Sequence, residues 1–227
     1  MTLITPNPCY EIEIRGPLSV RARSELVRVL NERGAELKSE RARRESYIFE
    51  AVKDGSLDLR LRKAESGPEL VLKRGPQRLA IARWKHTVGL RQDVDFKELL
   101  EFFAHYGYKA GRVVRRDYTT YTWSPWSAAY SFKIVLAEVP DFEEYNYFEI
   151  ERAVADREMI GPAVDQVHRV ATELGLTCWS SEEYAVYLGD LKQVDRRYEW
   201  IPKHEVSFDG VLDQFPLLGL KSGLGGD

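Results

Sequence analysis

The sequence predicts an α+β fold in which helices flank an antiparallel sheet, and two observations support this. First, charged and apolar side chains alternate in several short runs, such as Glu11–Arg15, Leu59–Lys63 and Phe148–Glu151. This is the period of a β-strand, in which residues i and i+2 share one face. Second, turn signals such as Gly67-Pro68 separate successive runs. Strands that follow one another through short turns indicate an antiparallel meander.

The first half of the chain reads as one strand, one helix and then a series of strands. Ser19 is expected to cap the helix and Gly34 to follow its end, because these residue types favour the two helix termini. The run Arg41–Arg44 is expected on a solvated face. The predicted elements are a strand over Cys9–Arg15, a helix over Ser19–Arg33, and strands over Ala35–Val52, Leu57–Lys63, Glu69–Arg74 and Leu79–Val88.

The second half has a similar order of elements and ends in an extension. Asp93 or Asp95 starts its first helix, and Ser180 with Glu183 resembles a capping box. The predicted elements are a helix from Asp95 to about Gly107, strands over Arg112–Trp123, Tyr130–Val139 and Tyr145–Ala153, and helices over Arg157–Leu174 and Ser180–Lys192. We therefore expect one domain over residues 1–190 and a C-terminal extension over residues 191–227, which packs on the domain and ends in flexible residues.

The composition narrows the function classes. The 227 residues include 33 Lys and Arg against 36 Asp and Glu, a balance that argues against a nucleic-acid-binding domain. Cys9 and Cys178 form neither a zinc motif nor a dense disulfide framework. The N-terminus does not resemble a secretory signal, and no apolar run approaches the roughly 20 residues of a membrane span. We expect a cytoplasmic protein without nucleic-acid or membrane partners, and a homodimer stays an open alternative.

Single strands of this chain carry pairs of acids or pairs of bases on one face. Glu11 and Glu13 form one acidic pair, Glu149 and Glu151 another, and Arg60 with Arg62 a basic pair. Carboxylate oxygens are the ligands that hard divalent cations prefer, and Arg grips phosphate oxygens at two points. A sheet that holds both kinds of pair fits a complex of a metal with a polyphosphate.

These motifs, in this order, resemble those of the CYTH superfamily, also called triphosphate tunnel metalloenzymes. Glu11-Ile12-Glu13 with Arg15 is similar to its opening E-x-E-x-K motif, and Arg60-Leu61-Arg62 to its R-x-R strand. Leu72–Pro76 resembles its L-K-G-P strand end, and Glu149-Ile150-Glu151 its closing E-x-E. The resemblance covers about residues 9 to 190. The superfamily includes class IV adenylate cyclases, thiamine triphosphatases and inorganic triphosphatases.

The resemblance implies an eight-stranded antiparallel β-barrel with flanking helices, whose charged lumen is a tunnel for a triphosphate. Mg²⁺ or Mn²⁺ would be held by Glu11, Glu13, Glu149 and Glu151, and Arg15, Glu11 and Glu13 would serve catalysis. The implied substrate-binding residues are Arg60, Arg62, Lys73, Arg83, Lys85, Arg115 and Lys133.

Metal-dependent hydrolysis of an inorganic or organic triphosphate is the favoured reaction. A metal-activated water is the expected nucleophile, since the sequence shows no evident side-chain nucleophile. It also contains no Walker-type phosphate loop. Two alternatives remain: a class IV-type adenylate cyclase, and a triphosphate- or nucleotide-binding protein that has lost catalysis.

Several positions depart from the superfamily pattern. Arg15 stands where the family has Lys, Lys85 where an acid often follows Arg83 by two residues, and Ala137 where an Asp is usual. Each of these changes makes the lumen more cationic or less acidic, or enlarges a cation, which is the reason for the non-catalytic alternative. Arg115 is followed by Asp117, and that carboxylate is a candidate replacement for the metal ligand missing at Ala137.

Overall fold

The computed structural model describes residues 9–49, 57–64, 67–74, 82–108, 110–194 and 196–199. The strands are β1 (Cys9–Pro17), β2 (Glu36–Phe49), β3 (Leu57–Ala64), β4 (Gly67–Arg74), β5 (Ala82–Gly89), β6 (Ala110–Trp123), β7 (Phe132–Glu138), β8 (Tyr147–Val154) and β9 (Arg196–Glu199). The α-helices are α1 (Val20–Glu32), α2 (Phe96–His105), α3 (Ile160–Glu173) and α4 (Ser181–Val194), and Glu143–Tyr145 and Arg157–Met159 form short 3₁₀ turns.

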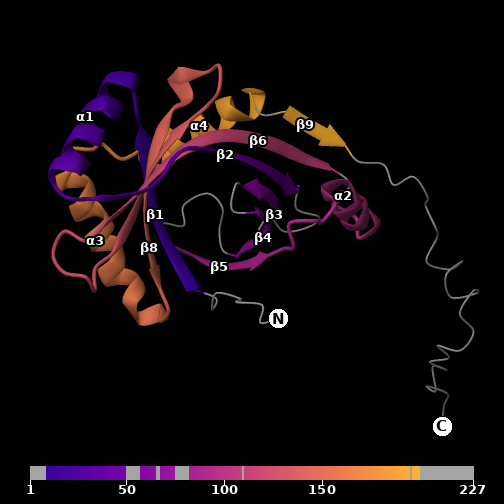
Figure 1. Cartoon of the computed structure of the whole chain (residues 1–227), viewed down its shortest axis with the longest axis horizontal. Coiled ribbons are helices and arrows are strands. Elements are labelled where there is room, and N and C mark those ends of the chain that lie inside the picture. Colours follow the sequence, from indigo (N-terminus) through magenta and orange to yellow (C-terminus); the bar gives the residue numbers. More distant parts are fainter. Residues whose placement is uncertain are drawn as a thin grey trace, which may run out of the picture.

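Eight of the strands close into an antiparallel ring (Figure 1). The hydrogen-bonded order is β2-β3-β4-β5-β1-β8-β7-β6, and an additional pairing between β2 and β6 joins the two ends. β9 pairs with Ala110–Val113 of β6, whereas β7 pairs with Asp117–Trp123 of the same strand. The predicted α+β class, with an eight-stranded antiparallel barrel and flanking helices, is confirmed.

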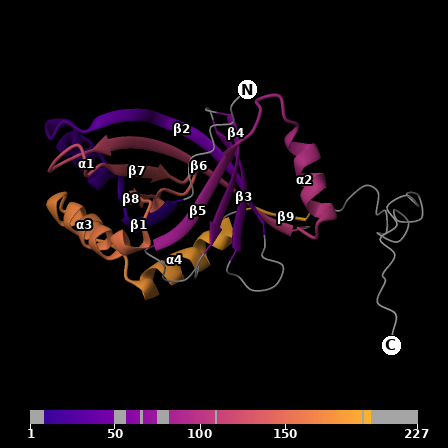
Figure 2. The same ribbon diagram turned by 90° about the horizontal axis from the view of Figure 1, so that it is seen from below.

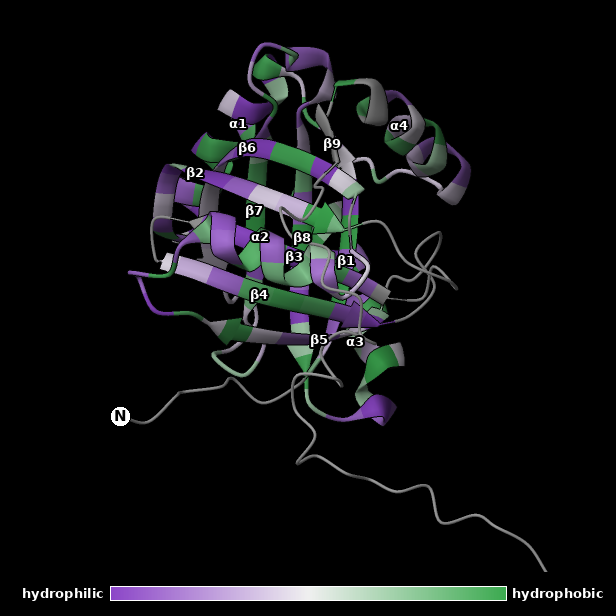
Figure 3. Cartoon of the chain, turned by 90° about the vertical axis from the view of Figure 1, so that its right-hand side faces the viewer, coloured by the Kyte–Doolittle hydropathy of each residue, from purple (hydrophilic) through white to green (hydrophobic). Residues whose placement is uncertain are grey.

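Helices cover two opposite sides of the ring. α1 and α3 lie against the strands β1 and β8, where Leu30 and Val167 join Ile12 and Phe148 in the larger core. α2 lies across the outer face of β3 and β4, and its Leu100 packs in the smaller core (Figure 3). The outward residues of these strands are therefore apolar, and polar residues are left for the interior.

The expected helix ends are present. Ser19 accepts a hydrogen bond from the Ala22 amide, and Asp95 caps α2 through the Lys97 amide. Gly34 follows α1 with a positive φ of 72°, a conformation that a residue without Cβ adopts easily. The capping box is also confirmed, since the Ser180 amide donates to the Glu183 carboxylate and the Glu183 amide to the Ser180 hydroxyl.

The C-terminal part begins with the predicted helix. α4 ends at Val194, close to the expected end near Lys192, and the next described residues form β9 on the edge of β6. Residues 200–227 lie outside the described part, as do Gly75 and Pro76 of the strand-end motif and the residues between β2 and β3. None of the described helices combines the length and the apolar character needed to cross a bilayer.

Candidate functional site

The interior of the ring holds a charged cavity of about 850 Å³. Because side chains alternate along each strand, one face of each of the eight strands is turned inward, and each strand contributes at least one residue to the cavity lining. Ile12 and Ile14 of β1 are buried in the outer core, whereas the residues that alternate with them, Glu11, Glu13 and Arg15, extend their side chains into the cavity. The Asp, Glu, Lys and Arg residues that line it are Glu11, Glu13, Arg15, Arg44, Asp58, Arg60, Arg62, Lys73, Arg83, Lys85, Arg112, Arg116, Lys133, Glu149 and Glu151.

All of the predicted site residues except Arg115 line this cavity. The placement predicted for Arg115 is wrong, because the inward residues of β6 include Arg112, Arg116 and Tyr118. The Arg115 side chain is 65% exposed on the outer face and donates to Glu45 at 2.6 Å.

Asp117 also points away from the cavity, so it does not replace a metal ligand. Its carboxylate accepts two hydrogen bonds from Arg43, at 2.8 and 2.9 Å. Ala137 is fully buried opposite Tyr147, and its neighbour Glu138 pairs outside the cavity with Arg23 and Arg41.

Sequence reasoning missed four charged residues of the cavity, namely Arg44, Asp58, Arg112 and Arg116. Asp58 lies two residues before Arg60, so strand alternation alone could have found it. Arg44 belongs to the run that was expected on a solvated face. The arginines of that run lie on different faces of β2. Arg41 and Arg43 pair with acids on the outer face, and Arg44 lines the interior.

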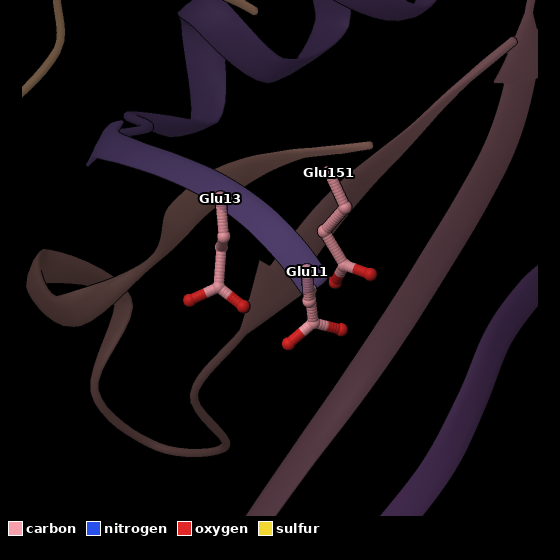
Figure 4. A group of neighbouring side chains, drawn as sticks. All are labelled: Glu11, Glu13 and Glu151. Atoms are coloured by element: carbon pink, nitrogen blue, oxygen red, sulfur yellow. The ribbon is translucent and has the colours of Figure 1, made fainter. Parts of the chain in front are cut away.

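Three carboxylates converge on one side of the cavity. Glu11 and Glu13 come from β1 and Glu151 from β8, and one oxygen of each lies within 4.8 Å of the others (Figure 4). In the register of the two strands Glu13 is directly opposite Glu151. Carboxylate oxygens at this separation form a donor set of the kind that Mg²⁺ or Mn²⁺ accepts, so this buried acidic cluster could bind a metal.

Basic side chains of the chain contact each of these carboxylates. Lys73 pairs with Glu11 and lies 3.3 Å from Glu13, Lys85 pairs with Glu11, and Lys133 lies 2.9 Å from Glu151. Burial would raise the pKa of Glu13, but the nearby cations Arg15 and Lys73 outweigh it and lower that pKa to about 2. The charges of the cluster are therefore balanced by basic side chains of the same chain.

Glu149 adjoins the three-carboxylate cluster, because its carboxyl group is in hydrogen-bonding contact with that of Glu151. Its carboxylate accepts a hydrogen bond from Arg15 at 2.7 Å. Burial raises the pKa of Glu149 even though the Arg15 charge opposes the shift. Of the four predicted metal ligands, Glu11, Glu13 and Glu151 form the closest group, and Glu149 contacts both Glu151 and Arg15.

Cations outnumber acids in the cavity. Among the described residues ten Lys or Arg side chains line it, against five carboxylates. Burial lowers the pKa of Arg62, and the like charges of Arg60 and Arg44 add to this. The nearest ion pair of Arg62 is a 4.0 Å contact with Glu69. Such an excess of buried positive charge attracts a polyanion, because the cations gain the partners they lack.

Asp58 is the acid that orders the basic side of the cavity. It accepts hydrogen bonds from Arg60 at 2.7 and 2.6 Å and from Arg83 at 3.0 Å. Burial would raise the pKa of Asp58, but Arg60 and Arg83 hold it far below its usual range. The two guanidinium groups are thereby fixed side by side on the cavity wall.

Arg15 is held by partners from three elements. It pairs with Glu13 and Glu149, and it donates a further hydrogen bond to the hydroxyl of Tyr184 in α4. The backbone makes this possible, because the Trp179 amide donates to the Arg15 carbonyl at 2.9 Å. At Gly16 any Cβ would overlap the Thr177 carbonyl oxygen, so only Gly permits this approach.

Aromatic residues before and within α4 form another part of the cavity wall. Trp179, Tyr184 and Tyr187 line the cavity, and the rings of Trp179 and Tyr187 stack with their centroids 4.2 Å apart. Figure 2 shows α3 and α4 following each other along one side of the ring. The charged interior is therefore bordered on this side by rings.

No protein-family model and no curated protein matches the sequence. Solved structures do match the fold. A candidate adenylate cyclase from Vibrio parahaemolyticus is 14% identical, covers 79% of this chain and 98% of its own, and gives a TM-score of 0.60. A protein from Pyrococcus horikoshii is 19% identical, with 80% and 99% covered and a TM-score of 0.55. A candidate adenylyl cyclase from Hippeastrum, described as having a dominant triphosphatase activity, is 16% identical, with 80% and 96% covered and a TM-score of 0.50.

Proposed function

We propose that this chain, which has the CYTH or triphosphate tunnel fold, hydrolyses a triphosphate in its charged cavity with the help of Mg²⁺ or Mn²⁺. One observation carries the proposal: a cluster of three carboxylates and an excess of cations line the same cavity. Phosphoryl transfer depends on charge neutralisation and positioning more than on covalent catalysis, and this cavity offers both. Inorganic triphosphate is the first substrate to test.

The basic wall would bind the phosphate chain. Arg60 and Arg83 are oriented by their shared partner Asp58, so their remaining N–H groups are preorganised toward an anion. Arg62 is paired weakly, through a 4.0 Å contact with Glu69, and is a good candidate to gain a phosphate partner. Guanidinium groups suit this role because their planar fork matches two phosphate oxygens at once.

The acidic wall would hold the divalent cation through Glu11, Glu13 and Glu151, whose oxygens are close enough to share one ion. The cation would supply neutralisation of phosphate charge and activation of water. Arg15 lies beside this cluster and is kept in place by Glu13, Glu149 and Tyr184. Its fixed position suits a charge that stabilises the attacked phosphate group.

A triphosphate-binding protein without catalysis is the second candidate, and one observation favours it. The carboxylates of the acidic cluster are already paired with Lys73, Lys85 and Lys133, so the free chain provides its own counter-charges. A cyclase is the third candidate. It would need a ribose hydroxyl as nucleophile and a pocket for adenine. The rings of Trp179 and Tyr187, which line the cavity, are the candidate surface on which an adenine would stack.

One experiment separates these candidates. The protein is incubated with inorganic triphosphate and, separately, with ATP, in each case with Mn²⁺, and the products are resolved by chromatography. Phosphate release that requires Mn²⁺ supports the hydrolase, and cyclic AMP supports the cyclase. Tight binding of triphosphate in EDTA by calorimetry, without turnover when Mn²⁺ is added, supports the binder. A folded protein that neither binds nor turns over either compound contradicts the proposal.

A further inference from the structure

The three-carboxylate cluster is matched by three lysines of the same chain. Lys73 is wedged between Glu11 and Glu13 with a side chain only 3% exposed. Lys85 from β5 pairs with Glu11, and Lys133 from β7 pairs with Glu151. Arg15 also pairs with Glu13, so three carboxylates and four cations meet at the place where a divalent cation would bind.

This pairing makes the cluster a poor site for a free metal ion. A divalent cation that binds the carboxylates must displace ammonium groups or remain close to them, and like charges at such distances repel strongly in a buried site. A displaced ammonium also needs a new partner, because an unpaired buried charge is costly. The neighbouring cavity wall cannot supply one, since it already has an excess of cations.

A polyphosphate would provide the missing partner. Its oxygens accept hydrogen bonds from ammonium groups, so the lysines can bind the polyphosphate in place of the carboxylates. The carboxylates are then free to bind the metal. We infer that this chain binds a divalent cation and a polyphosphate as a coupled pair, and that its own lysines occupy the carboxylates until the polyphosphate arrives. The polyphosphate half of this inference rests on the proposed function; the exclusion of free metal does not.

Lys85 is the best lysine for a test. Its side chain is 23% exposed and, among the described residues, it forms an ion pair with Glu11 alone, whereas Lys73 is deeply buried between two acids. Replacing Lys85 by Met removes the ammonium and keeps most of the side-chain length. Lys38 is the matched control, because it forms a similar pair with Glu36 on the exposed outer part of β2.

The first measurement is the affinity of the protein for Mn²⁺ alone. The concentration of free Mn²⁺ is read from its electron paramagnetic resonance signal. The wild-type protein is expected to bind Mn²⁺ weakly. Lys85→Met is expected to bind it about tenfold or more tightly, since one competing charge is gone, and Lys38→Met should match the wild type. Lys133→Met removes the partner of Glu151 and should also tighten Mn²⁺ binding. It replaces Lys85→Met in this measurement if Lys85→Met does not fold.

Two results of this measurement would overturn the inference. One is wild-type protein that binds Mn²⁺ as tightly in the absence of polyphosphate as Lys85→Met does. The other is an equal change in Lys85→Met and Lys38→Met, which would mean that only the net charge of the protein matters. Because no triphosphate is used, the measurement decides about the lysines even if triphosphate is not the substrate.

The second measurement tests the coupling itself. Inorganic triphosphate is titrated by calorimetry in EDTA and then with Mn²⁺ present, with correction for Mn²⁺ binding to triphosphate in solution. Coupling requires that each ligand tighten the other by the same factor. Equal triphosphate affinity in both titrations overturns the coupling, whereas no triphosphate binding in either overturns the proposed function.

Discussion

Asp58→Asn tests whether the basic wall of the cavity depends on one buried carboxylate. The Asp58 side chain is 6% exposed and accepts hydrogen bonds from both Arg60 and Arg83. The amide of Asn has nearly the same shape but no charge, so it leaves two buried guanidinium groups without their counter-ion. The change therefore isolates the electrostatic role of Asp58 from its packing.

The expected cost follows from the burial of the pair. Removing one member of a buried ion pair costs about 3 to 5 kcal/mol, and Asn retains one acceptor oxygen, so we expect a loss of about 3 kcal/mol in the free energy of unfolding. The pKa of Asp58 lies well below its unfolded value, so its contribution is complete above about pH 4 and disappears as the pH falls further. The difference from wild type should be constant between pH 8 and 5 and shrink in more acidic solution.

Urea unfolding followed by circular dichroism measures this difference, and Asp117→Asn is the control. Asp117 also accepts two hydrogen bonds from an arginine, but that partner, Arg43, is 69% exposed on the outer face. A solvated pair contributes about 1 kcal/mol or less. Equal losses in the two variants, or a loss below about 1 kcal/mol in Asp58→Asn, would refute the view that Asp58 compensates buried charge.

Two further changes test how Arg15 is placed. Gly16→Ala should lower the free energy of unfolding by about 3 kcal/mol or more in urea, because the added Cβ would overlap the Thr177 carbonyl oxygen. An unchanged urea midpoint would contradict the close contact between Gly16 and Thr177. Arg15→Lys should also lower the free energy of unfolding, by about 1.5 to 3 kcal/mol, because Lys cannot reach Glu13, Glu149 and Tyr184 together; full stability would mean that these contacts do not hold Arg15.

The sequence predicted the fold well because each strand carries its own pattern. Ile12 and Ile14 alternate with Glu11, Glu13 and Arg15, and in the structure the two sets lie on opposite faces of β1. Such a pattern specifies which face of a strand is inward, since a shift of one residue would bury the charges in the apolar core. The ends of helices were equally readable from their capping residues.

The prediction failed where two charged residues are adjacent. Arg115 and Arg116 follow each other in β6, so residue type alone does not say which one is inward. The prediction placed Arg115 in the cavity, whereas Arg116 lines it. The pairing of β6 with β2 also contains register shifts between Leu37 and Ala42, and sequence patterns do not reveal such irregularities.

The side-chain contacts inside the cavity could not be predicted from the sequence either. The contact between Lys85 and Glu11 depends on the register of β5 against β1, in which Glu11 is directly opposite Arg83. The contact between Arg15 and Tyr184 joins residues far apart in the chain and requires α4 to lie against the cavity. Strand alternation predicts which side chains face inward but not which of them meet.

The most direct test of the central claim compares two arginines on opposite sides of the barrel wall. Arg62 lines the cavity and Arg115 lies on the outer face. Release of phosphate from inorganic triphosphate is measured with Mn²⁺ for the wild type, Arg62→Ala and Arg115→Ala. The account predicts Mn²⁺-dependent turnover that falls about tenfold or more in Arg62→Ala and is unchanged in Arg115→Ala. Equal turnover in both variants, or no turnover by folded wild-type protein, would contradict it.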